Sequence, residues 1–149
     1  MMNKRLENKK AIVTGGSRGI GEGIVKRLYD EGCHIIIADI RKELAENLIS
    51  SLNKDQISFF QTDLAKEEDI KKLIEFTNNN WGSLDFLINN AGIMIPPPSK
   101  TEDGFEIQFG VNFVGHFALT GHLFNLLEST KDSRVVTLSS IAHRGAAID

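Results

Sequence analysis

Short apolar runs alternate along the chain with longer segments in which apolar residues recur three or four positions apart. Uninterrupted apolar runs are typical of strands buried on both faces, and the wider spacing is typical of helices. The runs that predict strands are 11–14, 35–38, 57–61, 84–89 and 134–138. The segments that predict helices are 20–29, the stripe Leu44, Leu48, Ile49 and Leu52, the stripe Ile70, Leu73 and Ile74, and 101–128.

The strict alternation of strands and helices predicts a parallel sheet with helices on both faces, connected by right-handed crossovers. Open sheets of this kind bind ligands at the carboxyl ends of their strands. The small and polar residues that fall at those ends are the segment 15–21, Asp39, Asp63, the segment 89–92 and Ser140. We therefore expect one ligand site along this edge of the sheet.

The glycines of the first strand-to-helix turn are Gly15, Gly19 and Gly21, which is the pattern TGxxxGxG and not GxGxxG. Such a turn lets backbone N–H groups and a helix N-terminus approach a pyrophosphate. Asp39 ends the second strand, where a carboxylate can accept from ribose hydroxyls. Together these features predict a dinucleotide site, and the alternative is a tight turn without a ligand.

The last predicted helix carries Phe105, Phe109, Phe113 and Phe117 at every fourth position. Such a stripe predicts core packing or a subunit interface rather than a cofactor site. Asn112 lies in the same apolar segment, where a buried amide needs hydrogen-bond partners. A functional or bridging role is therefore expected for Asn112.

The length of 149 residues fits one domain, 1–149, and the net charge of −3 gives no basic footprint for a nucleic-acid partner. The lone Cys33 excludes an internal disulfide framework, and we expect it to pack as a small apolar residue. The sequence shows no signal-peptide pattern and no apolar run long enough for a membrane span. A cytoplasmic location is the expectation.

Taken together and in this order, the motifs resemble those of the short-chain dehydrogenase/reductase family, and they extend over nearly all of the chain. The matching segments are 14–21, Asp63-Leu64, 89–92, Asn112 and the strand that ends in Ser139-Ser140. The segments 90–94 and 101–117 are similar to the retinol-dehydrogenase-like branch. The resemblance implies a Rossmann-type, doubly wound parallel sheet, present here as its N-terminal portion and truncated after about five strands.

The resemblance also implies two catalytic residues. Ser140 would hydrogen-bond the substrate oxygen, and Asn112 would interrupt the long helix and hold a water in a proton relay. A polar strand end is the alternative interpretation of Ser140. No metal site is implied, and His116 and His143 are expected to pack or to face solvent.

The cofactor implied by the resemblance is a nicotinamide dinucleotide. Its binding residues would be Gly15, Ser17, Arg18, Gly19, Ile20, Gly21, Asp39, Asp63, Leu64, Asn90, Ala91 and Gly92. Asp63 would accept from the adenine amino group, although capping the following helix is an alternative for it. Because the charge of Asp39 would repel a 2′-phosphate, NAD is favoured, with NADP as the second choice suggested by Arg18.

The family performs proton transfer with a Tyr-x-x-x-Lys pair that follows the catalytic serine. This sequence has one tyrosine, Tyr29, followed four positions later by Cys33, and it ends at Asp149. We therefore interpret the chain as the N-terminal part of a longer NAD(P)-dependent oxidoreductase that transfers a hydride between nicotinamide and a carbonyl or alcohol substrate. By itself it is expected to bind cofactor weakly and to be inactive because it is truncated, and the full-length protein is expected to form a homo-oligomer.

Two other functions fit the sequence less well. A naturally short, non-catalytic NAD-binding module has no need of Asn112 and Ser140. A nucleotide-sugar epimerase of the extended branch is disfavoured because its loop spacing differs from Gly15-Gly19-Gly21.

Overall fold

The computed structural model describes residues 4–52 and 55–141, and these contain a five-stranded parallel sheet of order β3-β2-β1-β4-β5. The strands are β1 (Lys10–Thr14), β2 (His34–Asp39), β3 (Ile57–Gln61), β4 (Phe86–Asn89) and β5 (Arg134–Thr137). The strand order reverses beside β1, as in a Rossmann-type sheet. The predicted fold class is therefore confirmed.

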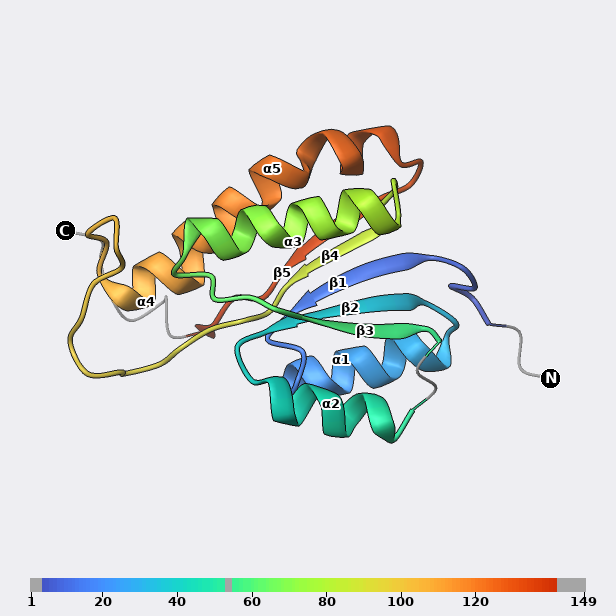
Figure 1. Cartoon of the computed structure of the whole chain (residues 1–149), viewed down its shortest axis with the longest axis horizontal. Helices are drawn as coiled ribbons and strands as arrows, with labels where there is room; N and C mark the ends of the chain where they lie inside the picture. Colours follow the sequence, from blue (N-terminus) through green and yellow to red (C-terminus); the bar gives the residue numbers. More distant parts are fainter. Residues whose placement is uncertain (1–3, 53–54, 142–149) are drawn as a thin grey trace.

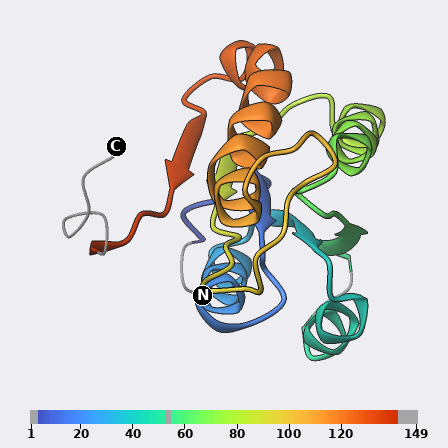
Figure 2. The ribbon, with the colours of Figure 1, turned by 90° about the vertical axis from the view of Figure 1, so that its left-hand side faces the viewer.

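Helices cover both faces of the sheet. They are α1 (Gly19–Asp30), α2 (Lys42–Ser50), α3 (Glu67–Asn80), the short α4 (Ile107–Phe109), the π-helical turn η1 (Gly110–Gly115) and α5 (His116–Ser129). α1 and α2 lie on one face, and α3 and α5 lie on the other (Figure 1). The view at right angles shows the same division (Figure 2), which follows from right-handed crossovers that run outward from β1 in both directions.

Strand β2 shows why the run 35–38 is apolar at every position. Ile36 packs under α3 and α5 with Leu73 and Leu119, whereas Ile35 and Ile37 belong to the core under α1 and α2. Successive strand side chains point to opposite faces, so a strand covered on both faces needs apolar residues at every position. All five of these side chains are fully buried.

Cys33 packs in the core under α1 and α2. Burial raises the pKa of its thiol to about 12, so the thiol stays protonated at neutral pH. It therefore packs as an apolar residue, as the sequence suggests.

Two helix predictions need correction. In α2, Leu44 is exposed and Ala45 is buried in its place. The long helix begins at Ile107 rather than at residue 101, because the side chain of Glu106 accepts from the amides of Gln108 and Phe109 and so caps the first turn there. Gly104 has a φ of +88°, a left-handed conformation that a helix does not contain.

The expected interruption at Asn112 is present, because residues Gly110–Gly115 form the π-helical turn η1. Gly115 in this turn lies against Leu64, and a Cβ at Gly115 would overlap the Leu64 carbonyl. The turn therefore lets the helix pass close to the segment that follows β3.

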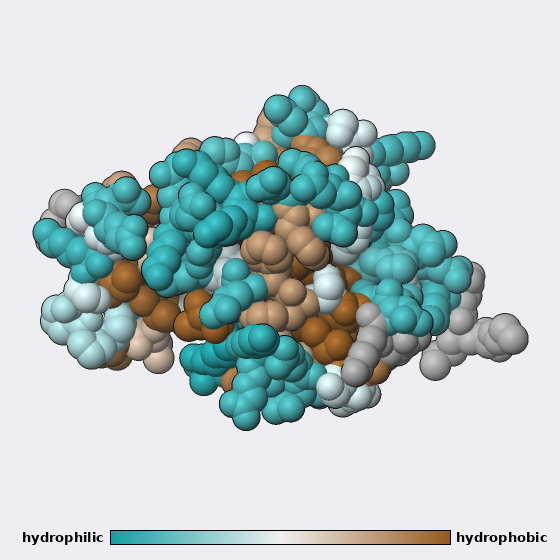
Figure 3. Space-filling model, in the orientation of Figure 1, coloured by the Kyte–Doolittle hydropathy of each residue, from teal (hydrophilic) through white to brown (hydrophobic). Residues whose placement is uncertain are grey.

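The phenylalanine stripe lies on the outside of the described part of the molecule. The exposed fractions of Phe109, Phe113 and Phe117 are 50%, 59% and 73%, so of the two predicted roles core packing is wrong and a subunit interface stays a prediction. The rings of Phe109 and Phe113 stack with centroids 5.3 Å apart, and those of Phe113 and Phe117 stack at 6.3 Å. Other hydrophobic surface gathers between α2 and α3, over the outer edge of β3 (Figure 3).

Candidate functional site

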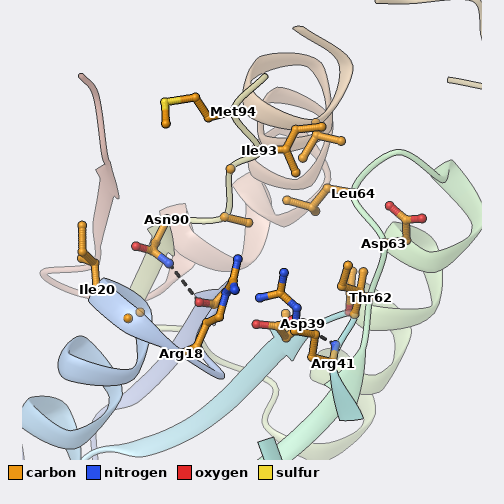
Figure 4. Close-up of a pocket in the computed structure, with 18 of the residues that line it drawn as sticks. Arg18, Ile20, Asp39, Arg41, Thr62, Asp63, Leu64, Asn90, Ile93 and Met94 are labelled. Carbon is orange, nitrogen blue, oxygen red and sulfur yellow. Dashed lines mark hydrogen bonds between the residues drawn. The ribbon is translucent and has the colours of Figure 1, made fainter. Parts of the chain in front are cut away.

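A cavity of about 770 Å³ opens at the carboxyl ends of the central strands. It is bordered by every predicted cofactor-binding residue except Ser17, namely Gly15, Arg18, Gly19, Ile20, Gly21, Asp39, Asp63, Leu64, Asn90, Ala91 and Gly92. Figure 4 shows side chains from several strand ends converging on it. The lining residues that the sequence did not single out are Ala38, Ile40, Arg41, Thr62, Ile93, Met94, Pro96 and Val111.

The turn between β1 and α1 requires glycine for steric reasons. Gly15 has a φ of +63°, and a Cβ there would lie 2.8 Å from the Cα of Ala91. A Cβ at Gly21 would overlap the carbonyl of Gly15. The N-cap residue of α1, Arg18, makes no side-chain cap hydrogen bond, so the amide dipoles of α1 meet the cavity without a side-chain cap. Such a helix end favours an anion.

Asp39 is buried at the end of β2, with 6% of its surface exposed. Its Oδ2 accepts from the amide of Ser17 at 3.0 Å and from the Ser17 hydroxyl at 2.5 Å, and its Oδ1 accepts from the Arg41 amide at 3.0 Å. A carboxylate has about four lone-pair sites. Asp39 therefore fixes the glycine turn through Ser17 and retains room for one more donor at the cavity.

Two arginines stand beside Asp39. Figure 4 shows Arg18 and Arg41 on the same side of the cavity as Asp39, with both side chains turned into it. No carboxylate of the described residues forms an ion pair with either guanidinium. Sequence reasoning missed Arg41, although its place two residues after the strand-ending aspartate was a usable signal. The pair makes this side of the cavity attractive to an anion.

Asp63 lies on the opposite wall, after β3. Its Oδ1 accepts from the amide of Ala65 at 2.9 Å, and its own amide donates to Asp69. The N-cap residue of α3 is Lys66, so the alternative in which Asp63 caps that helix is wrong. Leu64, beside it, presents an apolar side chain that is 7% exposed.

The loop after β4 is tied to the end of β1. The side-chain amide of Asn90 donates to the carbonyls of Thr14 at 2.8 Å and Gly15 at 3.1 Å. The backbone amides of Asn90 and Ala91 donate to the Thr14 hydroxyl at 2.9 and 3.0 Å. The loop therefore keeps a fixed position along one wall of the cavity.

Asn112 holds the far end of the same loop. Its Oδ1 accepts from the amide of Ile93 at 2.9 Å, and its Nδ2 donates to the Ile93 carbonyl at 2.9 Å. Asn112 is exposed, so the expectation of a buried amide is wrong, and these two bonds pair its side chain with the loop. The role in a proton relay stays a prediction.

Ser140 follows β5 and is exposed, and it does not border the cavity. His143 lies outside the described residues. Within residues 4–52 and 55–141, no group of three His, Cys, Asp or Glu side chains could hold a metal ion. None of the helices in those ranges has the length and apolar character to cross a membrane.

The sheet order and the cavity define a Rossmann-like α/β protein with an open cavity at its strand ends. The family model for short chain dehydrogenases matches residues 9–148. The chain therefore belongs to the short-chain dehydrogenase/reductase family, a family of NAD(P)-binding oxidoreductases.

Relatives and solved structures agree with this assignment. The polyprenol dehydrogenase of Danio rerio is 38% identical over 148 residues, which are 94% of this chain and 46% of that protein. Retinol dehydrogenase 11 of Mus musculus is 41% identical over 145 residues, 95% of this chain and 46% of that protein. A short-chain dehydrogenase/reductase (glucose/ribitol dehydrogenase) structure from Brucella melitensis has a TM-score of 0.82 at 28% identity, covering 97% of this chain and 62% of that one.

The chain thus spans about half the length of the curated relatives that it matches. Those relatives include the retinol dehydrogenases that the segments 90–94 and 101–117 resemble.

Proposed function

We propose that the cavity binds a nicotinamide dinucleotide and that the chain is the cofactor-binding part of an oxidoreductase that transfers a hydride between nicotinamide and a carbonyl or alcohol carbon. The observation that carries the proposal is the convergence on one cavity of the glycine turn, Asp39, the Asp63-Leu64 wall and the loop 90–93. These groups offer, in order along the cavity, donors for a diphosphate, an acceptor for a sugar and an apolar surface for a flat ring.

Each wall has a task in this proposal. The amides between Gly15 and Gly21 hold the diphosphate, and Asp39 uses its remaining lone pair on the adenosine ribose. Leu64 packs on the adenine, and Asp63 accepts from its amino group. The loop 90–92 lies along the nicotinamide half. When bound there, the dinucleotide supplies the hydride carrier, and the residues of this chain bind and orient it.

NAD is the cofactor that we propose, because a 2′-phosphate would stand close to the buried charge of Asp39. Two unit charges 4 Å apart repel by about 4 kcal/mol at an effective dielectric constant of 20. Arg18 and Arg41 face the same place and offset part of this repulsion, so NADP is the second cofactor of the site.

The substrate class follows from the relatives. Those with the names polyprenol dehydrogenase and retinol dehydrogenase point to a lipophilic alcohol or its carbonyl counterpart. Ser140 would bind the substrate oxygen and Asn112 would serve the proton relay. We propose a homo-oligomeric, cytoplasmic protein at full length.

Titration of NADH fluorescence with the 149-residue chain tests the cofactor site. We expect saturable, weak binding and no turnover, because no Tyr-x-x-x-Lys pair follows Ser140 in these residues. Replacing both arginines, Arg18→Ala with Arg41→Ala, should weaken NADPH binding about tenfold or more and NADH binding by clearly less, since each lost charge-assisted bond to the 2′-phosphate contributes about 1.5–3 kcal/mol. Failure of the unsubstituted chain to bind either cofactor would contradict the proposal.

A second measurement separates an enzyme from a non-catalytic NAD-binding module. If the coding sequence beyond Asp149 carries an in-frame Tyr-x-x-x-Lys pair and the longer chain oxidises or reduces the substrate class above, the enzyme is favoured. Cofactor binding without turnover in that longer chain would favour the module.

A further inference from the structure

His116 is a buried polar side chain that the proposed cofactor contacts do not use. It is the first residue of α5, it is 4% exposed, and it does not border the cavity. Its Nε2 lies 2.9 Å from the hydroxyl of Thr14, and its Nδ1 lies 3.2 Å from the backbone carbonyl of Asn112. The ring therefore connects the end of β1 with the π-helical turn.

The Thr14 hydroxyl determines where the proton of this ring lies. A hydroxyl has one hydrogen and two lone pairs. Both lone pairs are used by the amides of Asn90 and Ala91. The hydrogen is left for His116 Nε2 at 2.9 Å, since the other acceptor, the Ile88 carbonyl, is farther away at 3.3 Å. Nε2 must then accept, so it carries no hydrogen.

It follows that the neutral ring of His116 carries its proton on Nδ1, which donates to the Asn112 carbonyl. Burial lowers the pKa of His116 and so disfavours the doubly protonated ring, which agrees with this assignment. Every hydrogen bond in the series then runs in one direction, from the loop amides through Thr14 and His116 to Asn112. Aligned hydrogen bonds of this kind strengthen one another.

The series closes a circuit around the loop 90–93. Thr14 holds the near end of the loop through the amides of Asn90 and Ala91, and Asn112 holds the far end through Ile93. His116 joins the two residues that do the holding. Without it, β1 and the π-helical turn could move apart and the loop would lose its fixed register against the glycine turn.

We propose that His116 is a positioning residue that couples Thr14 to Asn112 and thereby holds the loop 90–93 in the geometry needed by the cofactor. The inference rests on the proposed function, because the loop is a wall of the proposed nicotinamide site. His116 acts through Thr14 and Asn112 and does not touch the cofactor.

The first test is a direct observation of the ring in the unsubstituted protein. Long-range ¹H–¹⁵N NMR spectra of ¹⁵N-labelled protein at pH 7 distinguish the two neutral tautomers and the doubly protonated ring, and the His116→Gln spectrum assigns the signals. We expect a proton on Nδ1 and none on Nε2. A proton on Nε2, in either the other tautomer or the imidazolium, overturns the proposal. The tautomer itself is observed in the unsubstituted protein, and the variant serves only to assign the signals.

The second test uses matched variants that remove the two hydrogen bonds of the His116 ring separately or together. Gln at position 116 can keep an acceptor for Thr14, Asn can keep a donor for the Asn112 carbonyl, and Phe keeps neither. Under native conditions, His116→Phe should raise amide hydrogen exchange about fivefold to tenfold at Asn90, Ala91 and Ile93, as expected for the loss of a buried hydrogen bond. His116→Gln should restore protection at Asn90 and Ala91, and His116→Asn at Ile93.

The same three substitutions at the exposed His122 of α5 serve as controls and should leave these amides unchanged. Unchanged exchange in His116→Phe would overturn the proposal. NADH affinity should fall about fivefold to tenfold in His116→Phe and recover in part in the other two variants.

The two proposals fail in different ways. If the unsubstituted chain does not bind NADH while the tautomer and the exchange pattern are as expected, the circuit stands and its purpose in cofactor binding is overturned. If NADH binds and the His116 ring carries a proton on Nε2, only the role of His116 is overturned.

Discussion

At the scale of single residues, Asp39 combines a structural and a functional task. Three donors, two from Ser17 and one from the Arg41 amide, already hold its carboxylate. A buried charge is stable only with such partners. The same bonds aim the carboxylate at the cavity, so the chain builds its proposed ribose acceptor from a residue that also fixes the glycine turn.

Replacing this carboxylate should change the cofactor preference. In Asp39→Ser, we expect NADH affinity to fall about tenfold or more, because a charged hydrogen bond contributes about 1.5–3 kcal/mol. NADPH affinity should rise, because the repulsion of the 2′-phosphate is gone while Arg18 and Arg41 remain. Fluorescence titration of both cofactors measures the ratio, and an unchanged ratio would place the adenosine ribose away from Asp39.

At the scale of elements, the turn between β1 and α1 needs a backbone conformation and a close approach that favour glycine. Gly15 has a positive φ and lies against the backbone of Ala91, whereas Gly23 lies in α1 with open space where a Cβ would be. The two glycines therefore differ in what an added methyl group would meet.

Alanine at these positions should have opposite effects on stability. Gly15→Ala should lower the free energy of unfolding by at least about 1–2 kcal/mol, since an L residue is strained at this φ. Gly23→Ala should raise it by about 0.5–1 kcal/mol because alanine is the better helix former. Urea unfolding measures both, and equal losses would mean that the turn has another conformation.

The C-terminal end of α1 is held by ion pairs. Glu31, its C-cap residue, accepts from Arg5 of the N-terminal segment and pairs with Arg27. The hydrogen bond from the Arg5 side chain is the main cause that lowers the pKa of Glu31 to about 2. A carboxyl whose pKa is lower in the folded state stabilises the fold above its unfolded pKa, and that stabilisation disappears as the pH falls toward the folded value.

We therefore expect part of the acid sensitivity of the fold to depend on Glu31. The urea midpoint of the unsubstituted protein should fall between about pH 5 and pH 2, and Glu31→Gln should show a lower midpoint at pH 7 with a smaller fall over that range. Glu43→Gln, at an exposed position of α2, is the matched control. Parallel pH curves for Glu31→Gln and the unsubstituted protein would contradict the assignment.

At the scale of the whole molecule, burial is uneven across the sheet. The core strands β1 and β2 are covered on both faces, but all four residues of β5 are exposed in the described part of the chain. Strand order places β5 at one end of the sheet with β4 as its neighbour. Local stability follows burial and contact density.

Hydrogen exchange should reveal this difference. Amides of β2 should exchange only with global unfolding, whereas amides of β5 should exchange faster through local opening. Mass spectrometry or NMR on the 149-residue chain measures both. Equal protection of Val136 in β5 and Ile36 in β2 would show that something covers β5 in solution.

Much of this architecture was predictable because periodicity reports burial directly. The run 35–38 is apolar on both faces, so it predicted a buried parallel strand, and the glycines of the first turn predicted a close backbone approach. The start of the last helix was missed because the capping by Glu106 depends on the local chain path rather than on periodicity. The circuit through His116 was missed because it depends on contacts between residues far apart in the sequence, whereas the signal for Arg41, its place two residues after Asp39, was local and was overlooked.

The position of β1 in the sheet has a thermodynamic consequence. The cavity is bordered by segments that follow β1, β2, β3 and β4, which come together only when the order of the sheet is complete. A ligand bound there would contact segments from both halves of the sheet, on either side of the reversal in strand order. Because ligand that binds only the native state adds RT ln(1 + [L]/Kd) to stability, occupancy should delay melting of the entire domain rather than of one neighbouring segment.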